Sequence, residues 1–319
     1  MQNQAALPKT KQRIGALLIK NSSAIFLLLL VLFNCVFTSN FITINTFWNL
    51  IIHSSPVILV AMSMTFVISS GGINISVGSI MAISGMLVVR LLPVVGLGVA
   101  LLLGILAGVL IGGLSGVIIT KFKIQPIIVT LAFMIAGRGI AQMIGDGYIL
   151  RFDSETLMSF AMKRIAGIPI QFFYVIAVVA IFLFIAQKTI FARYVEALGD
   201  NYQASYIAGI RVAVVLIAVY ALSGLMASLA GILTVARAGA ADPDTIGKGL
   251  EMSAIAAVAI GDTKMTGGKA KILGTLLGAL IMQLITTTFN MNNIPYEWSL
   301  VASTIVIIAA VFLQNIKED

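Results

Sequence analysis

Long apolar stretches follow one another along almost the whole chain, and they constrain its fold more than any other feature. The sequence has 319 residues, of which 60% are hydrophobic and only 10% charged. Soluble domains carry far more charge, and apolar stretches of about 18 residues or more are typical of helices that cross a bilayer. We expect an all-α protein, a polytopic membrane helical bundle of about ten spans, two of them short enough to be broken helices.

The polar segments between these stretches set the expected topology. Most of the 20 Lys and Arg residues fall in alternate loops, which places those loops and both termini in the cytoplasm. The first run, Ala24 to Phe37, follows a basic segment without a small-residue cleavage site, so we expect an uncleaved span. The ten predicted spans are 22–38, 50–70, 76–92, 95–120, 124–144, 170–187, 212–236, 250–262, 271–290 and 297–314.

The predicted permease domain covers 22–314, between cytoplasmic tails at 1–21 and 315–319. Its halves, about 22–144 and 170–314, have similar glycine patterns: Gly71-Gly72 and Gly267-Gly268 each precede a glycine-containing helix. Five spans in a half is an odd number, so the second copy must be inverted. Two inverted five-span repeats are a common plan of transporters.

The stretch from Ile68 to Gly78 interrupts the apolar pattern with glycines and polar residues. Unwound backbone in a bilayer is tolerated only against protein or a wet cavity, which predicts a broken helix facing a substrate path. Asn74 and Ser76 are the candidate path residues here. The alternative is a plain turn in which one of them caps the next helix, and both interpretations can hold.

Two further polar groups, Gln125 and Thr130, open the fifth span and are also candidate path residues. In the fourth span, glycines recur every fourth residue and predict one face for close helix packing. These are Gly104, Gly108, Gly112 and Gly116. Arg138 lies near the end of its span, where we expect it to snorkel to the interface.

The segment 188–211 is too polar to insert and too patterned for a free linker. We expect a short amphipathic cytoplasmic helix, with Ala204, Ile207 and Ala208 on one face. Such a helix either lies on the membrane or docks in a partner's groove. The chain contains no G-x-x-x-x-G-K-[ST] motif for ATP, which favours docking. Glu196 is expected to pair with Arg193 or with a base of the partner.

Several function classes lack the residues they need. A single cysteine, Cys35, excludes an internal disulfide and a cysteine metal site, and a single histidine, His53, excludes a histidine cluster. No nucleophile has a matching base, so we do not expect an enzyme. The net charge of +8 is dispersed over short loops and does not indicate nucleic acid binding.

Three motifs together resemble a known family. Gly71 to Gly78 is similar to the Gly-Gly-Ile-Asp-Leu-Ser-Val-Gly signature of ribose-type sugar permeases of bacterial ABC importers. Glu196 to Ile210 resembles the cytoplasmic coupling loop of that family, and Leu250 to Val258 resembles its Glu-Leu-Asp-Ala-Ile-Ala-Ala-Val segment. Lys123 to Pro126 and Ala136 to Gln142 look closest to the galactofuranose-type members. The similarity covers nearly the whole chain after residue 20.

The resemblance implies a permease subunit in the bacterial inner membrane that moves a monosaccharide by alternating access. Its implied partners are a second permease chain, identical or paralogous, cytoplasmic ATP-binding subunits and a periplasmic sugar-binding protein. ATP and Mg²⁺ would belong to the ATPase partner, with no cofactor on this chain. The segment 237–250 would help meet the binding protein. Contact with the ATPase is implied for Glu196, Ala197, Gly199, Asn201, Ala204, Ala208 and Gly209.

The sequence departs from the family pattern at three positions. Asn74 and Ser253 stand where the family has aspartates, and Asp262 replaces the second glycine of a Gly-Gly pair. Two intramembrane acids have thus become neutral groups, which avoids burying a carboxylate. We count Ser253 with the candidate path residues. Two hypotheses follow: a different substrate, or a divergent half of a heterodimer.

Other cargoes and another energy source remain as alternatives. The same permease plan could carry branched-chain amino acids, nucleosides or a furanosyl signal molecule. An ion-coupled secondary transporter would need a buried acid at mid-depth. Glu251, near the end of its span, is the nearest candidate for such an acid.

Overall fold

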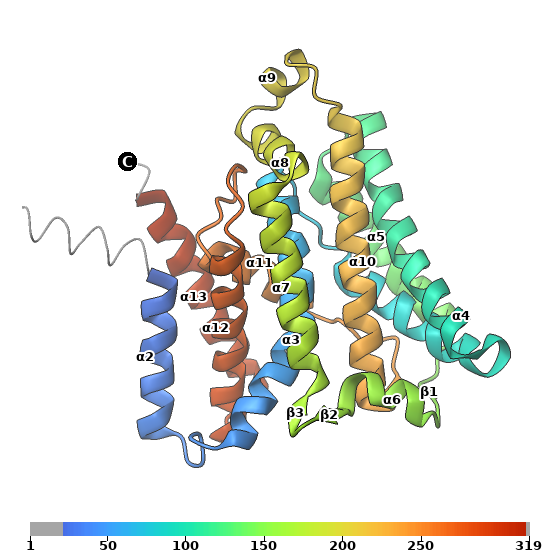
Figure 1. Cartoon of the computed structure of the whole chain (residues 1–319), viewed down its shortest axis with the longest axis vertical. Coiled ribbons are helices and arrows are strands. Elements are labelled where there is room, and N and C mark those ends of the chain that lie inside the picture. The colour runs from blue at the N-terminus through green and yellow to red at the C-terminus, as the bar shows by residue number, and fades with distance from the viewer. Residues whose placement is uncertain (1–21, 317–319) are drawn as a thin grey trace, which may run out of the picture.

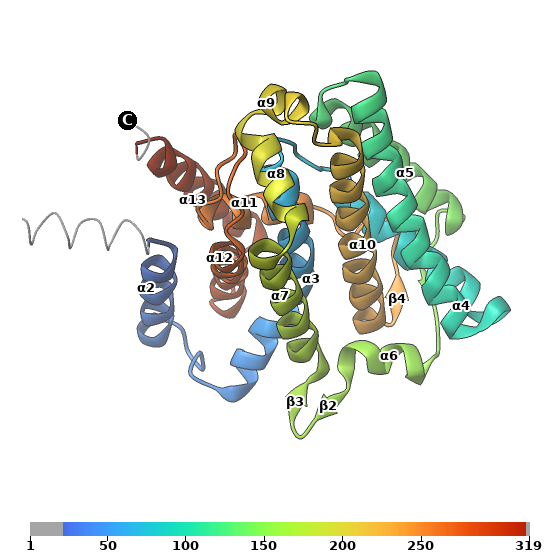
Figure 2. The same ribbon diagram turned by 45° about the horizontal axis from the view of Figure 1, so that its top comes forward.

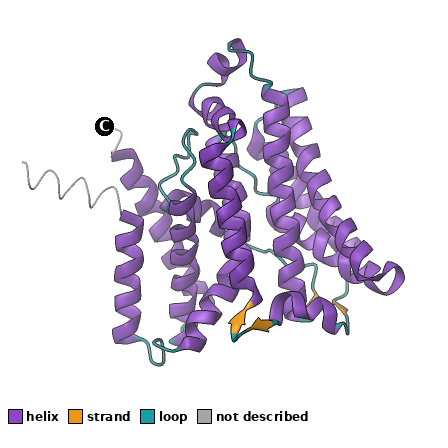
Figure 3. Ribbon diagram, in the orientation of Figure 1, coloured by secondary structure: helices purple, strands orange, loops and turns teal. Residues whose placement is uncertain are grey.

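The computed structural model describes residues 22–316, and these residues are almost entirely helical (Figure 3). The predicted tail 1–21 lies outside the described residues, as do residues 317–319. The helices are α2 (Ser22–Phe37), α3 (Ile44–Ser69), α4 (Val77–Phe122), α5 (Pro126–Ile144), α6 (Glu155–Met162), α7 (Ile170–Lys188), α8 (Ile190–Asp200), α9 (Tyr202–Ile207), α10 (Val212–Ala238), α11 (Leu250–Ile260), α12 (Ile272–Met291) and α13 (Tyr296–Ile316).

Four two-residue strands complete the described chain. β1 (Leu150–Arg151) pairs antiparallel with β4 (Ala240–Ala241), with Leu150 opposite Ala241. β2 (Arg164–Ile165) and β3 (Ile168–Pro169) form an antiparallel hairpin. Figures 1 and 2 show the strands and α6 at one end of the bundle, here called the strand end, and α9 at the other, the α9 end.

Within residues 22–316, six helices are long and apolar enough to cross a membrane: α3, α4, α5, α7, α10 and α12. This confirms the all-α membrane bundle, whereas the count of ten spans stays a prediction. Each predicted apolar segment is helical, and the third and fourth join in α4. They meet at Gly96, whose φ of 76° breaks the helix and belongs to the region that glycine alone enters easily.

Two helices begin in the interior of the bundle. Near the start of α4, the Ser79 hydroxyl donates to the carbonyl of Phe133, halfway along α5. A Cβ added at Gly78 would lie 2.6 Å from the carboxylate of Glu251, in the first turn of α11. With 11 residues, α11 is about half as long as a membrane crossing requires. The expected broken helices are therefore α4 and α11.

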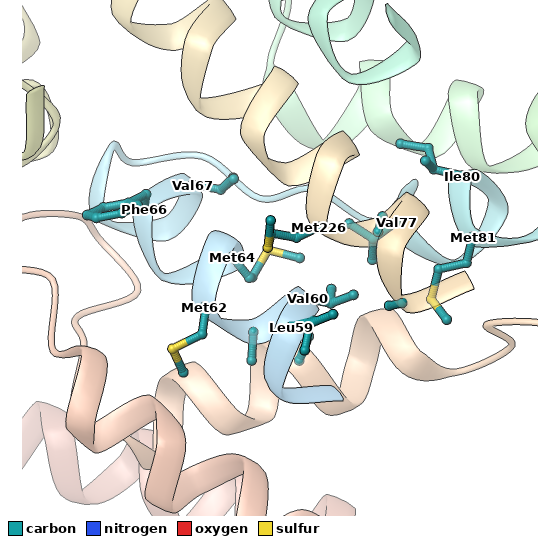
Figure 4. Close-up of a cluster of buried hydrophobic side chains, with 14 of the residues drawn as sticks. Leu59, Val60, Met62, Met64, Phe66, Val67, Val77, Ile80, Met81 and Met226 are labelled. Carbon is teal, nitrogen blue, oxygen red and sulfur yellow. The ribbon is translucent and has the colours of Figure 1, made fainter. Parts of the chain in front are cut away.

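The core surrounds the second half of α3, where the residues from Ile58 to Ser69 are all buried. Figure 4 shows Met62, Met64 and Phe66 of α3 among buried side chains of α4 and α10. The ring of Phe66 stacks on Phe182 of α7. Since α3 contacts α7, α10, α11 and α12, it is the central column of the bundle.

The glycine face predicted in the fourth span packs on neighbouring helices. A Cβ added at Gly108 would lie 2.7 Å from the Gly224 carbonyl oxygen of α10, and one at Gly116 would lie 2.8 Å from the Ile217 Cα. Gly112 faces the same helix, and Gly104 faces Val88 in the other limb of α4. Small residues on both sides let the two backbones touch.

The two Gly-Gly pairs that suggested the repeat lie at the same end of the molecule. The Gly268 backbone N–H donates to the carbonyl of Ser69, two residues before Gly71. Equivalent positions of an inverted repeat must lie at opposite ends. Matching Gly71-Gly72 with Gly267-Gly268 is therefore wrong.

Gly112→Ala should lower the melting temperature of the purified protein in detergent, because its Cβ would clash with the α10 backbone. Overpacking costs about 1–3 kcal/mol, whereas alanine gains only about 1 kcal/mol over glycine in a helix. Gly113→Ala is the matched control, since its Cβ meets only Ala221, at 3.9 Å. Equal melting temperatures for the two variants would contradict the packing role.

Candidate functional site

The chain unwinds between α3 and α4 at two glycines. Gly71 has a φ of 80°, which favours glycine. A Cβ added at Gly72 would lie 2.5 Å from the hydroxyl oxygen of Tyr220, so a larger residue there would displace the tyrosine side chain. The segment from Ser70 to Ser76 then leads from the end of α3 to the start of α4.

Asn74 holds this segment in place through three hydrogen bonds. Its Oδ1 accepts from the Ser76 backbone N–H at 3.0 Å and from the Ser76 hydroxyl at 2.7 Å. Its Nδ2 donates to the Ser223 hydroxyl of α10 at 3.0 Å. All three side chains are fully buried. Asn74 thus ties the residue before α4 to α10. Among the described residues, neither Asn74 nor Ser76 makes a side-chain cap bond to an N–H within α4, so the helix-capping alternative is not confirmed.

Of the remaining candidate path residues, Thr130 bonds the same unwound segment as Asn74, whereas no hydrogen bond between described residues joins Gln125 or Ser253 to it. Thr130 is buried, and its hydroxyl donates to the carbonyls of Pro126 at 3.0 Å and Ile73 at 3.3 Å. Ser253 is partly buried in α11 and donates to the Gly249 carbonyl at 3.3 Å. Gln125 is exposed before α5.

A cavity of about 1140 Å³ opens at the α9 end, between the ends of α3 and α4, the segment α8–α9 and the start of α10. We call it the inner cavity. Gln125, Ser70 and Gln203 line it. Tyr220 lines it too, with a fully buried side chain whose hydroxyl has no hydrogen-bond partner among the described residues. That hydroxyl offers a donor to a polar molecule in the cavity.

The predicted amphipathic segment is present as two short helices with different environments. α8 packs inward through Ala192, Val195 and Leu198, all buried. The Glu196 carboxylate accepts from the Ala270 backbone N–H at 3.0 Å, so Glu196 binds this chain's own loop 261–271 and not Arg193. A Cβ added at Gly199 would lie 2.5 Å from the Gly268 backbone nitrogen and would clash with the Ser69 carbonyl. The backbone of α8 therefore packs directly against the end of α3.

α9 lies outside this packing. Asn201 caps it by accepting from the Ala204 backbone N–H at 2.9 Å. Ala204, Ala208 and Gly209 are exposed, and Ala197 is partly exposed on α8. Three large side chains of α9 face outward: Tyr202 is 52% exposed, Tyr206 65% and Ile207 76%. Aromatic and apolar groups gathered on so short a helix are typical of a protein contact.

Arg138 does not snorkel, so that expectation is wrong. Its guanidinium donates to the carbonyls of Pro243 and Ile246, both at 2.8 Å. Gln142, one turn on, donates to the Asp244 carboxylate at 2.7 Å. The segment 239–249 therefore folds against α5, which the sequence signalled only by its many glycines and Asp-Pro-Asp.

Asp262 occupies a position with a left-handed backbone conformation at the end of α11. Its φ is 64°, a left-handed conformation that aspartate tolerates better than most residues. The carboxylate also pairs with the Lys271 ammonium. The substitution is thus accommodated by a local ion pair at the end of α11.

Residues 46–311 match the family described as branched-chain amino acid transport system / permease component. The ribose import permease protein of Haemophilus influenzae is 34% identical over 95% of both chains. The galactofuranose transporter permease protein of Escherichia coli is 36% identical over 82% of this chain and 77% of its own. The fructose import permease protein of Bifidobacterium longum is 32% identical over 93% and 89%. No solved structure matches the chain.

Asn74→Leu should lower the free energy of unfolding by about 1–3 kcal/mol, because it leaves buried partners unpaired. Asn74→Asp should cost less, since a carboxyl group still accepts from Ser76 and the Ser223 hydroxyl can turn to donate. Melting curves in detergent measure both. Thr234→Val is the control, because its hydroxyl bonds only within α10. A leucine variant as stable as this control would show that Asn74 is not a structural tie.

Proposed function

Because the chain belongs to the family of import permeases that includes the ribose and galactofuranose proteins, we propose that it is the membrane-spanning subunit of an ATP-driven importer of a monosaccharide. The relatives' names supply the cargo class. The observation that carries the driving mechanism is the α8–α9 segment, which combines an exposed face with a rigid attachment to α3.

ATP hydrolysis acts from outside this chain in this proposal. Cytoplasmic ATP-binding subunits, which hold the ATP and Mg²⁺, contact the exposed face of α9. Their closure moves α8 and, through Gly199 and Glu196, the end of α3 and the loop 261–271. A second permease chain completes the pathway, and a periplasmic sugar-binding protein delivers cargo at the strand end. We keep the domain limits predicted from the sequence, with the permease domain at 22–314. The coupling element within it consists of α8 and α9.

Orientation follows from charge. Eight basic residues lie at helix ends or in loops at the α9 end of the bundle: Lys121, Lys123, Lys188, Arg193, Arg211, Lys264, Lys269 and Lys271. Basic loops stay in the cytoplasm, so the α9 end is cytoplasmic. The described chain also begins and ends toward this side (Figure 1), which agrees with two cytoplasmic termini.

The inverted repeat is proposed with a new correspondence. In the first unit, α3 runs from the strand end to the α9 end. The segment 70–76 then returns to the interior, where the first limb of α4 begins. In the second unit, α10 runs in the opposite direction, from the α9 end to the strand end. The segment 239–249 then returns to the interior, where α11 begins. Each unit thus pairs a long helix with a helix that starts inside the bundle, the plan in which a transporter places its site between two broken helices.

Cells that express this chain with its partner subunits should take up a labelled pentose or hexose. Uptake should stop when ATP is depleted and continue when an uncoupler collapses the proton gradient. The panel includes branched-chain amino acids and nucleosides to identify other cargoes. Uptake that survives ATP depletion and fails with the uncoupler would contradict the ATP-driven mechanism.

The double variant Tyr206→Ala, Ile207→Ala should weaken binding of the ATP-binding subunits by roughly thirtyfold, equivalent to about 2 kcal/mol for a contact hot spot. Binding is measured by titrating the purified subunits onto the permease in nanodiscs. Tyr148→Ala is the control, because Tyr148 is 75% exposed but lies at the strand end. Equal affinity for both variants would exclude α9 as the docking face.

A further inference from the structure

A second, smaller cavity of about 500 Å³ lies toward the strand end, between α3, α10 and α12. We call it the outer pocket. Unlike the lipid-facing surface of the bundle, it is lined by residues of which eight in ten carry a polar side chain, Leu50 and Met291 being the exceptions. Polar groups within spanning helices are costly and mark functional paths. The polar side chains of this pocket come from three helices.

α12 supplies four of these side chains: Gln283, Thr286, Thr287 and Asn290. Their spacing of three and four residues places them on one face of the helix. The first half of α12 is apolar apart from Thr275, so this polar face is confined to the half toward the strand end. The Gln283 amide is only weakly engaged, at 3.4 Å from the Thr287 hydroxyl.

α3 and α10 complete the pocket. Asn49 and His53 lie one turn apart on α3. Arg237 comes from the last turn of α10 and donates to the Ile52 carbonyl at 3.1 Å. A guanidinium has five N–H donors, so this bond leaves others for a ligand. Among the residues that the structure describes, none that lines the pocket carries a carboxylate, which disfavours a cation.

The two cavities lie at opposite ends of the same helix pair. The inner cavity is bounded by the end of α3 and the start of α10. The outer pocket is bounded by the start of α3 and the end of α10. A pathway that opens alternately to each side needs one cavity at each end, and here the same two helices border both.

We propose that the outer pocket holds the neutral monosaccharide when it first enters this chain, an inference that rests on the proposed function. Carboxamides both donate and accept hydrogen bonds, as sugar hydroxyls do. Asn49, Gln283 and Asn290 therefore match a ring of hydroxyls in either direction, and Arg237 adds donors. The threonine hydroxyls extend this polar surface along α12.

The test uses three neighbouring residues of α12: Thr287 and Asn290, which line the pocket, and Thr288, which does not. Thr287→Val and Asn290→Leu remove polar groups from the pocket and should each raise the KM for sugar uptake about fivefold, the effect of one lost hydrogen bond. Thr288→Val is the isosteric control, because the Thr288 hydroxyl bonds the Leu284 carbonyl of its own helix. Its KM should equal that of the wild type.

Access is measured separately by cysteine labelling. The chain has one cysteine, so Cys35→Ala gives a cysteine-free background for Thr287→Cys and Thr288→Cys. A membrane-impermeant thiol reagent added outside intact cells should label the cysteine at 287 much faster than that at 288. The transported sugar should slow that labelling at least severalfold, whereas a sugar that is not transported should leave it unchanged.

The outcomes separate this inference from the proposed function. Wild-type cells that take up no sugar refute the proposed function and this inference with it. Normal uptake with unchanged KM in both pocket variants overturns the outer pocket alone. Labelling at 287 that no transported sugar slows also overturns it, as does protection by a sugar acid but not by a neutral sugar.

Discussion

The structure depends on one constraint: backbone that unwinds inside a bilayer must find its hydrogen-bond partners within the protein. The segment 70–76 does so through Asn74, which accepts from Ser76, and through Thr130, which donates to the Ile73 carbonyl. The segment 239–249 does so through Arg138, which donates to two of its carbonyls. Side chains of α5 therefore stabilise both segments, and α4 and α11 can start in the interior of the bundle.

This arrangement links the interior of the bundle to the surface at the α9 end. α8 touches the last residue of α3, directly before the unwound segment, and holds the loop that joins α11 to α12 through Glu196. A displacement of α8 therefore reaches both broken helices without passing through lipid-facing helices. Glycine at 199 allows this contact, because any Cβ would push α8 away from Ser69.

Much of the fold could be predicted from the sequence, because apolar runs and glycine spacing directly reflect membrane spans and close packing. The break at Gly71-Gly72, the short helices between 188 and 211 and the glycine face of α4 are examples. The partners of Arg138 and Glu196 could not be predicted, because they lie more than 70 residues away in the chain. Matching the Gly-Gly pairs failed for a related reason: Gly268 hydrogen-bonds to Ser69, so the two glycine pairs lie at the same end of the bundle and are not symmetry mates. The sequence contains the polar residues of α12 between Gln283 and Asn290. It does not show that side chains of α3 and α10 lie beside them and form a pocket.

Pulsed electron paramagnetic resonance on the complete transporter gives the most direct test of coupling through α8. Spin labels replace Gln203 on α9, Lys269 in the loop that Glu196 holds, and Ile124 on the opposite wall of the inner cavity. If α8, α9 and the loop 261–271 move as one body, the distance from 203 to 269 stays the same with and without ATP, while the distance from 203 to 124 changes. A changed distance from 203 to 269, or no change from 203 to 124, would contradict this mechanism.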